Sequence, residues 1–191
     1  MKKIFIIEHL EPELYDWCIM EYKHISKIVG KENLWFTNIK KSNANKLNKY
    51  GQVFSSSVKE MSLSKVCILD PEADETLNPN NSKDYEYFVF GGILGDYPPK
   101  KRTEQELSRF MRNAKKFDIG KEQMSTDNAV YTVKQIISGK RLSDMKFQDS
   151  VEIKVNKAMS TKLPYKYNLV NGKPLISPEL INFIKKRDGK D

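Results

Sequence analysis

The chain has 191 residues and a mass of 22.2 kDa, which suits one domain, or one domain with a small appendage. Hydrophobic residues make up 39% of the sequence and aromatic residues 10%, so the chain can bury a core and is not disordered as a whole. Its 33 basic and 25 acidic residues give a net charge of +8. This charge favours an acidic partner such as nucleic acid, a ribonucleoprotein or an anionic cofactor, although a lysine-biased genome would explain it equally well.

The cysteines and the hydropathy pattern indicate in which cellular compartment the protein is expected. The two cysteines, Cys18 and Cys67, lie far apart in the sequence, which is neither a disulfide framework nor a zinc site and fits a reducing compartment. No apolar run approaches the roughly 20 residues of a membrane span. The apolar run between Lys3 and Glu8 is too short for a signal peptide. We therefore expect a soluble, cytoplasmic protein.

From the N-terminus onward, apolar runs of strand length alternate with helical periods. Residues 3–7 predict a strand, and Pro12 begins a predicted helix that ends at Gly30. The runs at 34–37, 66–69 and 87–90 do not alternate, which is typical of strands covered on both faces. The predicted inner stripe of the first helix consists of Leu14, Trp17, Cys18, Ile25 and Ile28.

Two polar stretches, residues 40–49 and 78–83, are interpreted as insertions that are too short to separate domains. Further along, Thr103 and Glu106 predict a capping box before an apolar stripe of Leu107, Phe110 and Met111. Another helix is expected over about 126–138, ending at Gly139, with Val130, Val133, Ile136 and Ile137 facing inward.

The C-terminal part has a different character. Val151, Ile153 and Val155 alternate with polar residues, as in a half-exposed strand, and Asn171-Gly172 predicts a tight hairpin turn. A short helix over 178–186 follows. We predict an α/β core over residues 1–145, with a mainly parallel sheet flanked by helices. A small hairpin-containing C-terminal extension over residues 146–191 is expected to pack on it.

The most distinctive motif covers residues 88–99, with the sequence FVFGGILGDYPP. A buried strand ends in three glycines, an aspartate and two prolines, and ligands of α/β sheets bind beyond such strand ends. The alternative is a tight turn that needs positive φ. The motif is not a Rossmann fingerprint, which requires glycines after the first strand. Neither GxxxxGK[ST] nor HExxH occurs, so nucleotide hydrolysis and zinc proteolysis are unsupported.

Other polar groups follow predicted strands. Residues 119–127 either cap the next helix or contact a ligand, and residues 69–71 contain a common Asp-Pro turn. Glu8, His9 and Glu11 cluster after the first strand, where a carboxylate could orient a cationic substrate or move a proton, or could simply be solvated. Residues 100–102 (KKR) are either a solvated loop or a site for carboxylate, phosphate or RNA.

Together these segments resemble the SPOUT-class methyltransferases often labelled SAM-dependent RNA methyltransferases. The similarity extends from Lys3 to about Lys186. Fungal members of that family act as protein arginine methyltransferases on a small-subunit ribosomal protein. The resemblance rests on Ile7-Glu8-His9, Trp17, Glu21-Tyr22, residues 66–71, residues 88–96, Pro98-Pro99, Arg102-Thr103 and residues 123–127.

The resemblance implies a fold with a trefoil knot, in which S-adenosylmethionine binds in a bent shape and is contacted mostly by backbone. No metal is implied. Where the family carries a basic residue before the third cofactor loop, this sequence has Phe117-Asp118. The implied cofactor-binding residues are Leu69, Asp70, Pro71, Phe90, Gly91, Gly92, Gly95, Asp96, Ile119, Gly120, Gln123 and Met124.

An arginine acceptor calls for carboxylates, because a guanidinium binds them bidentately. We expect Glu8 and Asp96 to orient the acceptor and take up its proton, and Arg102 to hold Asp96 or a cofactor carboxylate. The expected partner is a ribosomal protein or the small ribosomal subunit. Two alternatives remain open: an RNA methyltransferase acting on ribosomal or transfer RNA, and a non-catalytic ribosome- or RNA-binding module. SPOUT enzymes are usually homodimers, but the extension could cover the dimer surface, which favours a monomer.

Overall fold

The computed structural model describes residues 2–96, 98 and 100–189. Its centre is a six-stranded sheet in which every pair of neighbouring strands is parallel. The mainly parallel sheet expected from the apolar runs is therefore confirmed. In spatial order the strands are β3 (Gln52–Val53), β2 (Leu34–Thr37), β1 (Ile4–His9), β5 (Tyr87–Gly92), β4 (Val66–Leu69) and β6 (Lys115–Phe117).

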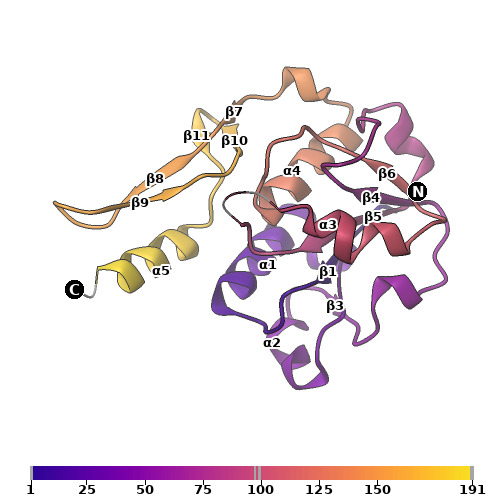
Figure 1. Cartoon of the computed structure of the whole chain (residues 1–191), viewed down its shortest axis with the longest axis horizontal. Helices are drawn as coiled ribbons and strands as arrows, with labels where there is room; N and C mark the ends of the chain where they lie inside the picture. Colours follow the sequence, from indigo (N-terminus) through magenta and orange to yellow (C-terminus); the bar gives the residue numbers. More distant parts are fainter. Residues whose placement is uncertain (1, 97, 99, 190–191) are drawn as a thin grey trace.

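Helices cover both faces of this sheet (Figure 1). The two long helices, α1 (Asp16–Val29) and α4 (Thr126–Ile137), pack together on one face. The short α2 (Ala44–Leu47) buries Leu47 in the same cluster. The opposite face is covered by η3 (Val58–Glu60), α3 (Arg102–Glu106) and η5 (Ser108–Phe110). The remaining short turns are η1 (Lys31–Asn33), η2 (Lys41–Asn43), η4 (Asn81–Asp84) and η6 (Leu142–Asp144).

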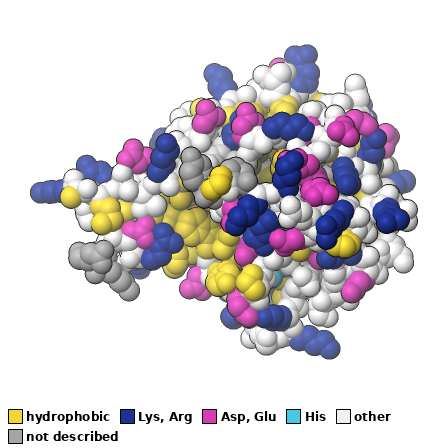
Figure 2. Space-filling model, in the orientation of Figure 1, with side chains coloured by type: hydrophobic (Ala, Val, Ile, Leu, Met, Phe, Trp, Pro, Cys, Tyr) yellow, Lys and Arg dark blue, Asp and Glu magenta, His cyan; other side chains and the backbone are white. Residues whose placement is uncertain are grey.

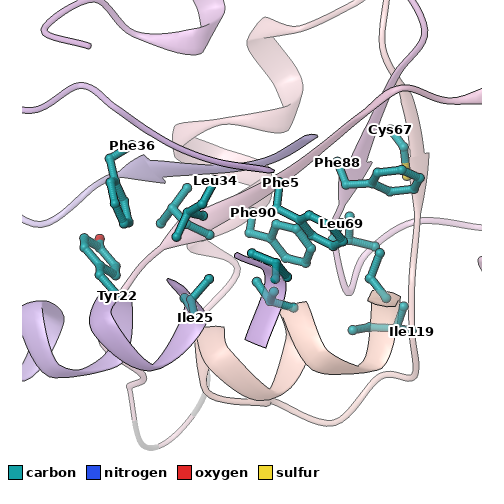
Figure 3. Packing of buried hydrophobic residues seen from close by; sticks show 14 of the residues in the cluster. Phe5, Tyr22, Ile25, Leu34, Phe36, Cys67, Leu69, Phe88, Phe90 and Ile119 are labelled. Atoms are coloured by element: carbon teal, nitrogen blue, oxygen red, sulfur yellow. The ribbon is translucent and has the colours of Figure 1, made fainter. Parts of the chain in front are cut away.

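The alternation of side chains along each strand divides the core into two layers. On β1, Phe5 and Ile7 face α1 and α4, whereas Ile4 and Ile6 face η3 and α3. Figure 3 shows the first layer, where Tyr22 and Ile25 of α1 point toward aromatic and aliphatic side chains of the sheet. All six residues of β1 are buried, because both faces of the strand are covered.

The C-terminal residues form small antiparallel sheets and a final helix. β8 (Val151–Lys154) and β9 (Ser160–Leu163) make a hairpin that projects from the core with α5 (Pro178–Asp188) alongside it (Figure 1). We call β8, β9 and α5 the arm. The strands β7 (Phe147–Gln148), β10 (Tyr167–Val170) and β11 (Lys173–Pro174) connect it to the rest of the chain.

An apolar cluster joins the arm to α1. Leu163 and Ile184 of the arm are buried in one cluster with Met20 of α1, and Trp17 packs against it. A buried polar network adds to the joint, because Asn168 of β10 donates from its backbone N to Asn128 Oδ1 over 2.8 Å. The extension therefore contacts the core through apolar and polar groups.

Several local predictions are confirmed. The alternation at 151–154 gives a strand with Val151 and Ile153 buried and their neighbours exposed. The hairpin turn has Asn171 at φ 52° and Gly172 at φ 76°. The helix at 126 ends before Gly139, whose φ is 100°.

Other predictions need correction. The first helix begins at Asp16, not at Pro12, because Glu11 is held outside it by Arg102 and the backbone N of Leu94. Trp17 is half-buried and packs toward the arm instead of the sheet. No capping box forms at Thr103: α3 already begins at Arg102, which pairs with Glu11 and Glu106.

The predicted inward stripe after α3 holds only in part. Leu107 is buried, whereas Phe110 is 54% exposed. Tyr97 and Pro99 of the glycine-rich motif lie outside the described residues. The trefoil knot stays a prediction, because strand order alone does not define how the loops thread. Among the described residues, the helices are all too short or too polar to cross a membrane.

Candidate functional site

A cavity of about 250 Å³ opens where β4, β5 and β6 end. The carboxyl ends of parallel strands meet at one edge of a sheet, so the loops that follow these three strands converge. The side chains of Leu69, Phe90 and Ile119 contribute apolar surface to the cavity, and Ala129 of α4 lines it from the helix. Figure 3 shows Leu69, Phe90 and Ile119 within the packed layer.

Most of the predicted cofactor residues line this cavity. They are Leu69, Asp70, Pro71, Phe90, Gly91, Gly95, Asp96, Ile119, Gly120, Gln123 and Met124. The three segments that the sequence singled out separately are therefore brought together. Residues that line the cavity without having been predicted for it include Glu72, Thr103, Thr126 and Ala129.

Gly92 is the exception among the predicted cofactor residues. It does not line the cavity, and a Cβ on it would lie 2.3 Å from the Oη atom of Tyr22. That hydroxyl is also 2.8 Å from His9 Nδ1, and burial lowers the pKa of His9. Gly92 is therefore needed for packing against α1.

The other two glycines of the motif face the cavity and allow close packing there. A Cβ on Gly95 would lie 2.1 Å from Gln123 Nε2 and 2.5 Å from Tyr165 Cε1. Neither Gly91 nor Gly95 has positive φ, unlike Gly120 at 102°. The tight-turn alternative therefore does not hold for Gly91 or Gly95. A side chain on Gly95 would have no room, whereas a Cβ on Gly91 would lie 3.0 Å from Ile93 Cδ1, a tight contact that a small shift of Ile93 relieves.

The cavity fits S-adenosylmethionine in its chemistry. The Nε2 atom of Gln123 is buried and has no hydrogen-bond partner among the described residues. A buried donor without an acceptor is costly, so a bound polar molecule would satisfy it. Apolar walls beside a few polar groups are the usual lining of a cofactor site.

The structure does not place Glu8 in this cavity. Its side chain is fully buried on the opposite face of the sheet, in line with Ile4 and Ile6. Its carboxylate accepts hydrogen bonds from Thr37 Oγ1 at 2.6 Å, Ser57 Oγ at 2.5 Å and Val58 N at 2.9 Å. The prediction that Glu8 meets the acceptor is therefore corrected, because its oxygens are already engaged between β2 and η3.

Asp96 and Arg102 both line the cavity but do not contact each other. Asp96 pairs with Lys100 over 3.1 Å. Arg102 donates to Glu11 Oε1 over 2.8 Å and to Glu106 Oε1 over 2.7 Å. The same Glu11 oxygen accepts the backbone N–H of Leu94 over 2.8 Å. Arg102 thus ties the glycine-rich loop to the end of β1, which corrects its predicted pairing with Asp96.

Each cation that lines the cavity has a carboxylate partner. Lys100 pairs with Asp96, Lys101 with Glu72, and Lys121 with Asp118 over 3.2 Å. Arg102 completes the set through Glu11 and Glu106. Figure 2 shows acidic and basic side chains intermingled over the region of α3. The cavity mouth therefore has no group of unpaired cations.

The loop after β6 is tied to the loop after β4 near Phe117-Asp118, where the sequence differs from the family that it resembles. Asp118 accepts the backbone N–H of Gly120 over 2.9 Å, and Phe117 is buried in the core. Lys121 donates to the carbonyl of Pro71 over 2.9 Å. A lysine a few residues later thus supplies a cation at this loop.

Glu21 is a candidate site residue that the sequence reasoning did not assign. It lies on α1, is 6% exposed, and accepts a hydrogen bond from Trp17 Nε1 over 2.9 Å. Burial, followed by the nearby charge of Asp127, raises the pKa of Glu21 to about 8, and hydrogen bonds from Trp17 and Thr126 partly oppose this shift. Thr126 also lines the cavity, so Glu21 lies just behind its wall.

The arm adds one aromatic residue to the same place. Tyr165, between β9 and β10, donates to the carbonyl of Gly95 over 3.0 Å. Burial raises its pKa, and the charges of Glu21 and Asp96 add to the shift. Tyr165 therefore lies against the glycine-rich loop, close enough to both carboxylates to feel their charge.

The signal for Glu21 was present in the sequence. It is four residues after Trp17 and four before Ile25, so a carboxylate occupies the inner stripe of the helix. No such signal existed for Tyr165, which is 70 residues from Gly95 in the chain. Within the described part of the chain, no three His, Cys, Asp or Glu side chains are grouped as a metal site would require.

Comparison with known proteins gives matches along nearly the whole chain. Residues 4–191 match the family described as SFM1-like protein arginine N-methyltransferases. Protein arginine N-methyltransferase SFM1 of Saccharomyces cerevisiae is 36% identical over 200 aligned positions, covering 95% of this chain and 94% of the yeast protein.

Solved structures match as well. The yeast arginine methyltransferase SFM1 in complex with SAM superposes with a TM-score of 0.89 at 34% identity, covering 100% of this chain and 93% of that one. A dual-specific Trm10 of Thermococcus kodakaraensis gives a TM-score of 0.57 at 18% identity, covering 74% and 95%. This second likeness concerns the fold alone, and the two together confirm the expected SPOUT-type α/β fold.

Proposed function

Because this chain belongs to the family of SFM1-like protein arginine N-methyltransferases, we propose that it transfers a methyl group from S-adenosylmethionine to an arginine of a ribosomal protein. The observation that supports this most is the cavity at the ends of β4, β5 and β6. It combines apolar walls, one glycine without room for a side chain, Gly95, and the unpartnered amide nitrogen of Gln123.

The residues that would hold the cofactor are those of the three converging loops. Leu69, Phe90 and Ile119 offer apolar surface, and Gln123 offers a buried donor. When bound, S-adenosylmethionine supplies a methyl group on a positively charged sulfur, which leaves as a neutral thioether. Positioning of the acceptor is then the main contribution of the protein.

We assign the acceptor guanidinium to the side of the cavity that Asp96 lines. A guanidinium prefers carboxylates, and Asp96 exposes 28% of its side chain at the cavity. One guanidinium nitrogen forms the new N–C bond and gives up its proton. Asp96 is the proposed group that binds the guanidinium and receives this proton.

The paired cations at the cavity mouth support a protein acceptor over an RNA acceptor. A phosphate that approached Lys100 or Lys101 would meet the negative charge of Asp96 or Glu72 beside the ammonium group. The family membership weighs against the third possibility, a non-catalytic binding module.

The direct test uses methyl-labelled S-adenosylmethionine and small ribosomal subunits from cells that lack this methylation. We expect label that is lost on protease treatment and kept on nuclease treatment. Label lost to nuclease would mean an RNA methyltransferase, and no label with intact cofactor binding by calorimetry would mean a different protein substrate.

Variants test the acceptor assignment separately from the cofactor site. Asp96→Asn should lower turnover by about 10²-fold, while the affinity for S-adenosylhomocysteine changes by less than about threefold. Exposed Glu32→Gln serves as the matched control. Normal turnover in Asp96→Asn would contradict the assignment.

The proposed partner is the small ribosomal subunit, met in the cytoplasm. Both cysteines are buried and free, which suits a reducing compartment.

We also propose a monomer, because the extension packs against α1 through Met20 and Trp17. Light scattering coupled to size-exclusion chromatography tests this, and a mass of two chains would contradict it.

A further inference from the structure

The positive charge of this protein is concentrated in its C-terminal extension. Residues 146–191 contain ten lysines and arginines and five acidic residues, so these 46 residues carry +5 of the net +8. The other 145 residues carry only +3. A general lysine bias would spread the excess charge in proportion to length, which is not observed.

The charge gathers at the outer end of the arm. Lys154 and Lys162 lie on the exposed face of the β8–β9 hairpin, and Lys157 lies in its turn. Lys185 and Lys186 lie in the last turn of α5, which is joined to the hairpin where Thr161 Oγ1 donates to Asp188 over 2.6 Å. These five exposed lysines are called the arm tip. Figure 2 shows blue side chains on the visible surface of the arm.

None of the arm-tip lysines forms an ion pair with another described residue. The acidic groups nearby are engaged: Ser160 donates to Glu152, and Arg187 pairs with Asp188 over 2.5 Å. At the cavity mouth, by contrast, every lining cation has a carboxylate partner. An anion at the mouth would therefore meet a carboxylate beside each lining cation, whereas the arm-tip lysines have no such partner among the described residues.

We propose that the arm tip binds the phosphate backbone of RNA and thereby holds the subunit while the acceptor arginine enters the cavity. This inference rests on the proposed function, because a ribosomal protein presents its arginines among RNA phosphates. Lysine ammonium groups bind phosphates as point charges and release counterions from the RNA. A membrane surface would favour several exposed large apolar side chains, and among the described residues of the arm only Met159, in the hairpin turn, is one, at 38% exposed.

A binding experiment tests the arm tip without any methylation. The probe is a fluorescently labelled 20-base-pair RNA duplex, titrated with the full chain at 50 to 200 mM salt. The triple variant Lys154→Gln, Lys157→Gln, Lys162→Gln should weaken binding at least tenfold. It should also reduce the slope of log K against log salt by about 2 to 3, close to one per lost phosphate contact.

The matched control replaces three exposed lysines of the core that form no ion pair with other described residues, Lys31→Gln, Lys41→Gln and Lys46→Gln. It removes the same charge from a different face. An equal loss of affinity in both variants would overturn the proposal, since binding would then depend on net charge alone. No loss in the arm variant would overturn it as well.

Two further probes separate RNA from other acidic partners. Vesicles with phosphatidylserine and a polyglutamate peptide should bind more weakly than the RNA duplex at equal salt. Tighter binding to either would replace RNA by a membrane or an acidic protein as the partner. Methylation adds a second readout: the arm variant should raise KM severalfold for intact subunits relative to RNA-free protein extracted from them.

RNA affinity and methylation together distinguish a failure of the arm proposal from a failure of the proposed function. If no methyl transfer occurs but the arm variant still loses RNA affinity, the proposed substrate fails and the arm assignment stands. If methyl transfer occurs and the KM ratio is unchanged in the arm variant, the proposed function stands and the arm assignment fails.

Discussion

At the scale of single residues, the two carboxylates Glu8 and Glu21 show which kind of burial a sequence can predict. Glu8 follows an apolar strand and looks like a strand-end site residue. However, all six residues of β1 are buried, so the sequence contains no polar–apolar alternation to tell which face Glu8 occupies. Glu21 lies on a helix stripe that the sequence does define. Its burial was thus predictable, whereas the burial of Glu8 needed the position of η3.

Replacing Glu8 should affect stability before it affects chemistry. Glu8→Gln removes the charge that accepts hydrogen bonds from Thr37, Ser57 and Val58 inside the core. We expect the free energy of unfolding to fall by about 2 to 4 kcal/mol, measured by urea denaturation. Glu60→Gln, on the exposed part of η3, is the control and should change it by less than about 0.5 kcal/mol. A Glu8 variant with full stability and no turnover would return this residue to the catalytic site.

Glu21 should make the folded state less stable as pH rises. Its pKa is raised to about 8 by burial and by Asp127, so the folded chain keeps a proton that the unfolded chain has lost above about pH 4.5. The contribution of Glu21 to the free energy of unfolding is therefore largest below that pH and declines toward pH 8, with a slope of up to about 1.4 kcal/mol per pH unit. Glu21→Gln should flatten the decline, measured as the difference in unfolding free energy from the wild type between pH 5 and 8. Parallel pH curves for the two proteins would contradict the raised pKa.

At the scale of elements, the convergence of the three cofactor loops was predictable. The runs at 66–69 and 87–90 are strands without alternation, and parallel strands place their following loops at one edge. What the sequence could not provide are contacts between distant segments. Tyr165 reaches Gly95 from the arm, and Arg102 reaches Glu11 across 91 positions, which delays the start of α1.

The Arg102 contacts should determine how tightly the cofactor is held. Arg102 joins α3 to Glu11, and Glu11 holds the backbone N–H of Leu94 in the glycine-rich loop. Arg102→Lys keeps the charge but loses the planar donor geometry. We expect the Kd for S-adenosylhomocysteine to rise about tenfold by calorimetry, which corresponds to about 1.4 kcal/mol.

Arg109→Lys is the matched control for Arg102→Lys, because Arg109 is exposed on η5 and pairs with no carboxylate of the described chain. Glu11→Gln combined with Arg102→Lys should cost little more than either change alone, since the two residues act through one contact. Additive losses would mean that they affect the cofactor independently.

At the scale of the whole molecule, the boundary predicted near residue 146 is a boundary of charge and shape more than of packing. The arm projects from the core (Figure 1), yet its cluster includes Met20 of α1. The guanidinium of Arg187 lies 5.6 Å from the ring of Trp17. Asn168 is buried and donates to Asn128 and Thr132 of α4. The sequence predicted a change in hydrophobic pattern at this boundary, but it did not predict these contacts between the extension and the core.

These contacts predict that the arm and the core unfold together. The two tryptophans report on different parts, because Trp17 contacts the arm while Trp35 lies in β2 and packs against Phe54 with ring centroids 5.0 Å apart. In the variant Trp35→Phe only Trp17 remains, so fluorescence reports on the contact between the arm and α1. In Trp17→Phe only Trp35 remains, so fluorescence reports on the sheet. Within each variant, the urea midpoint from fluorescence should agree with that from far-ultraviolet circular dichroism to about 0.2 M, as a two-state transition requires.

Asn128→Ala provides the complementary change. Asn128 also donates to the carbonyl of Leu175 over 2.9 Å, so its loss leaves several buried groups without partners. We expect a loss of about 2 to 4 kcal/mol, with both fluorescence midpoints moving together. A Trp17 transition at lower urea than the Trp35 transition would show that the arm unfolds first. Residues 146–191 would then form a separate unit that the core holds only loosely, and the arm tip would have to bind RNA without a fixed orientation toward the cavity.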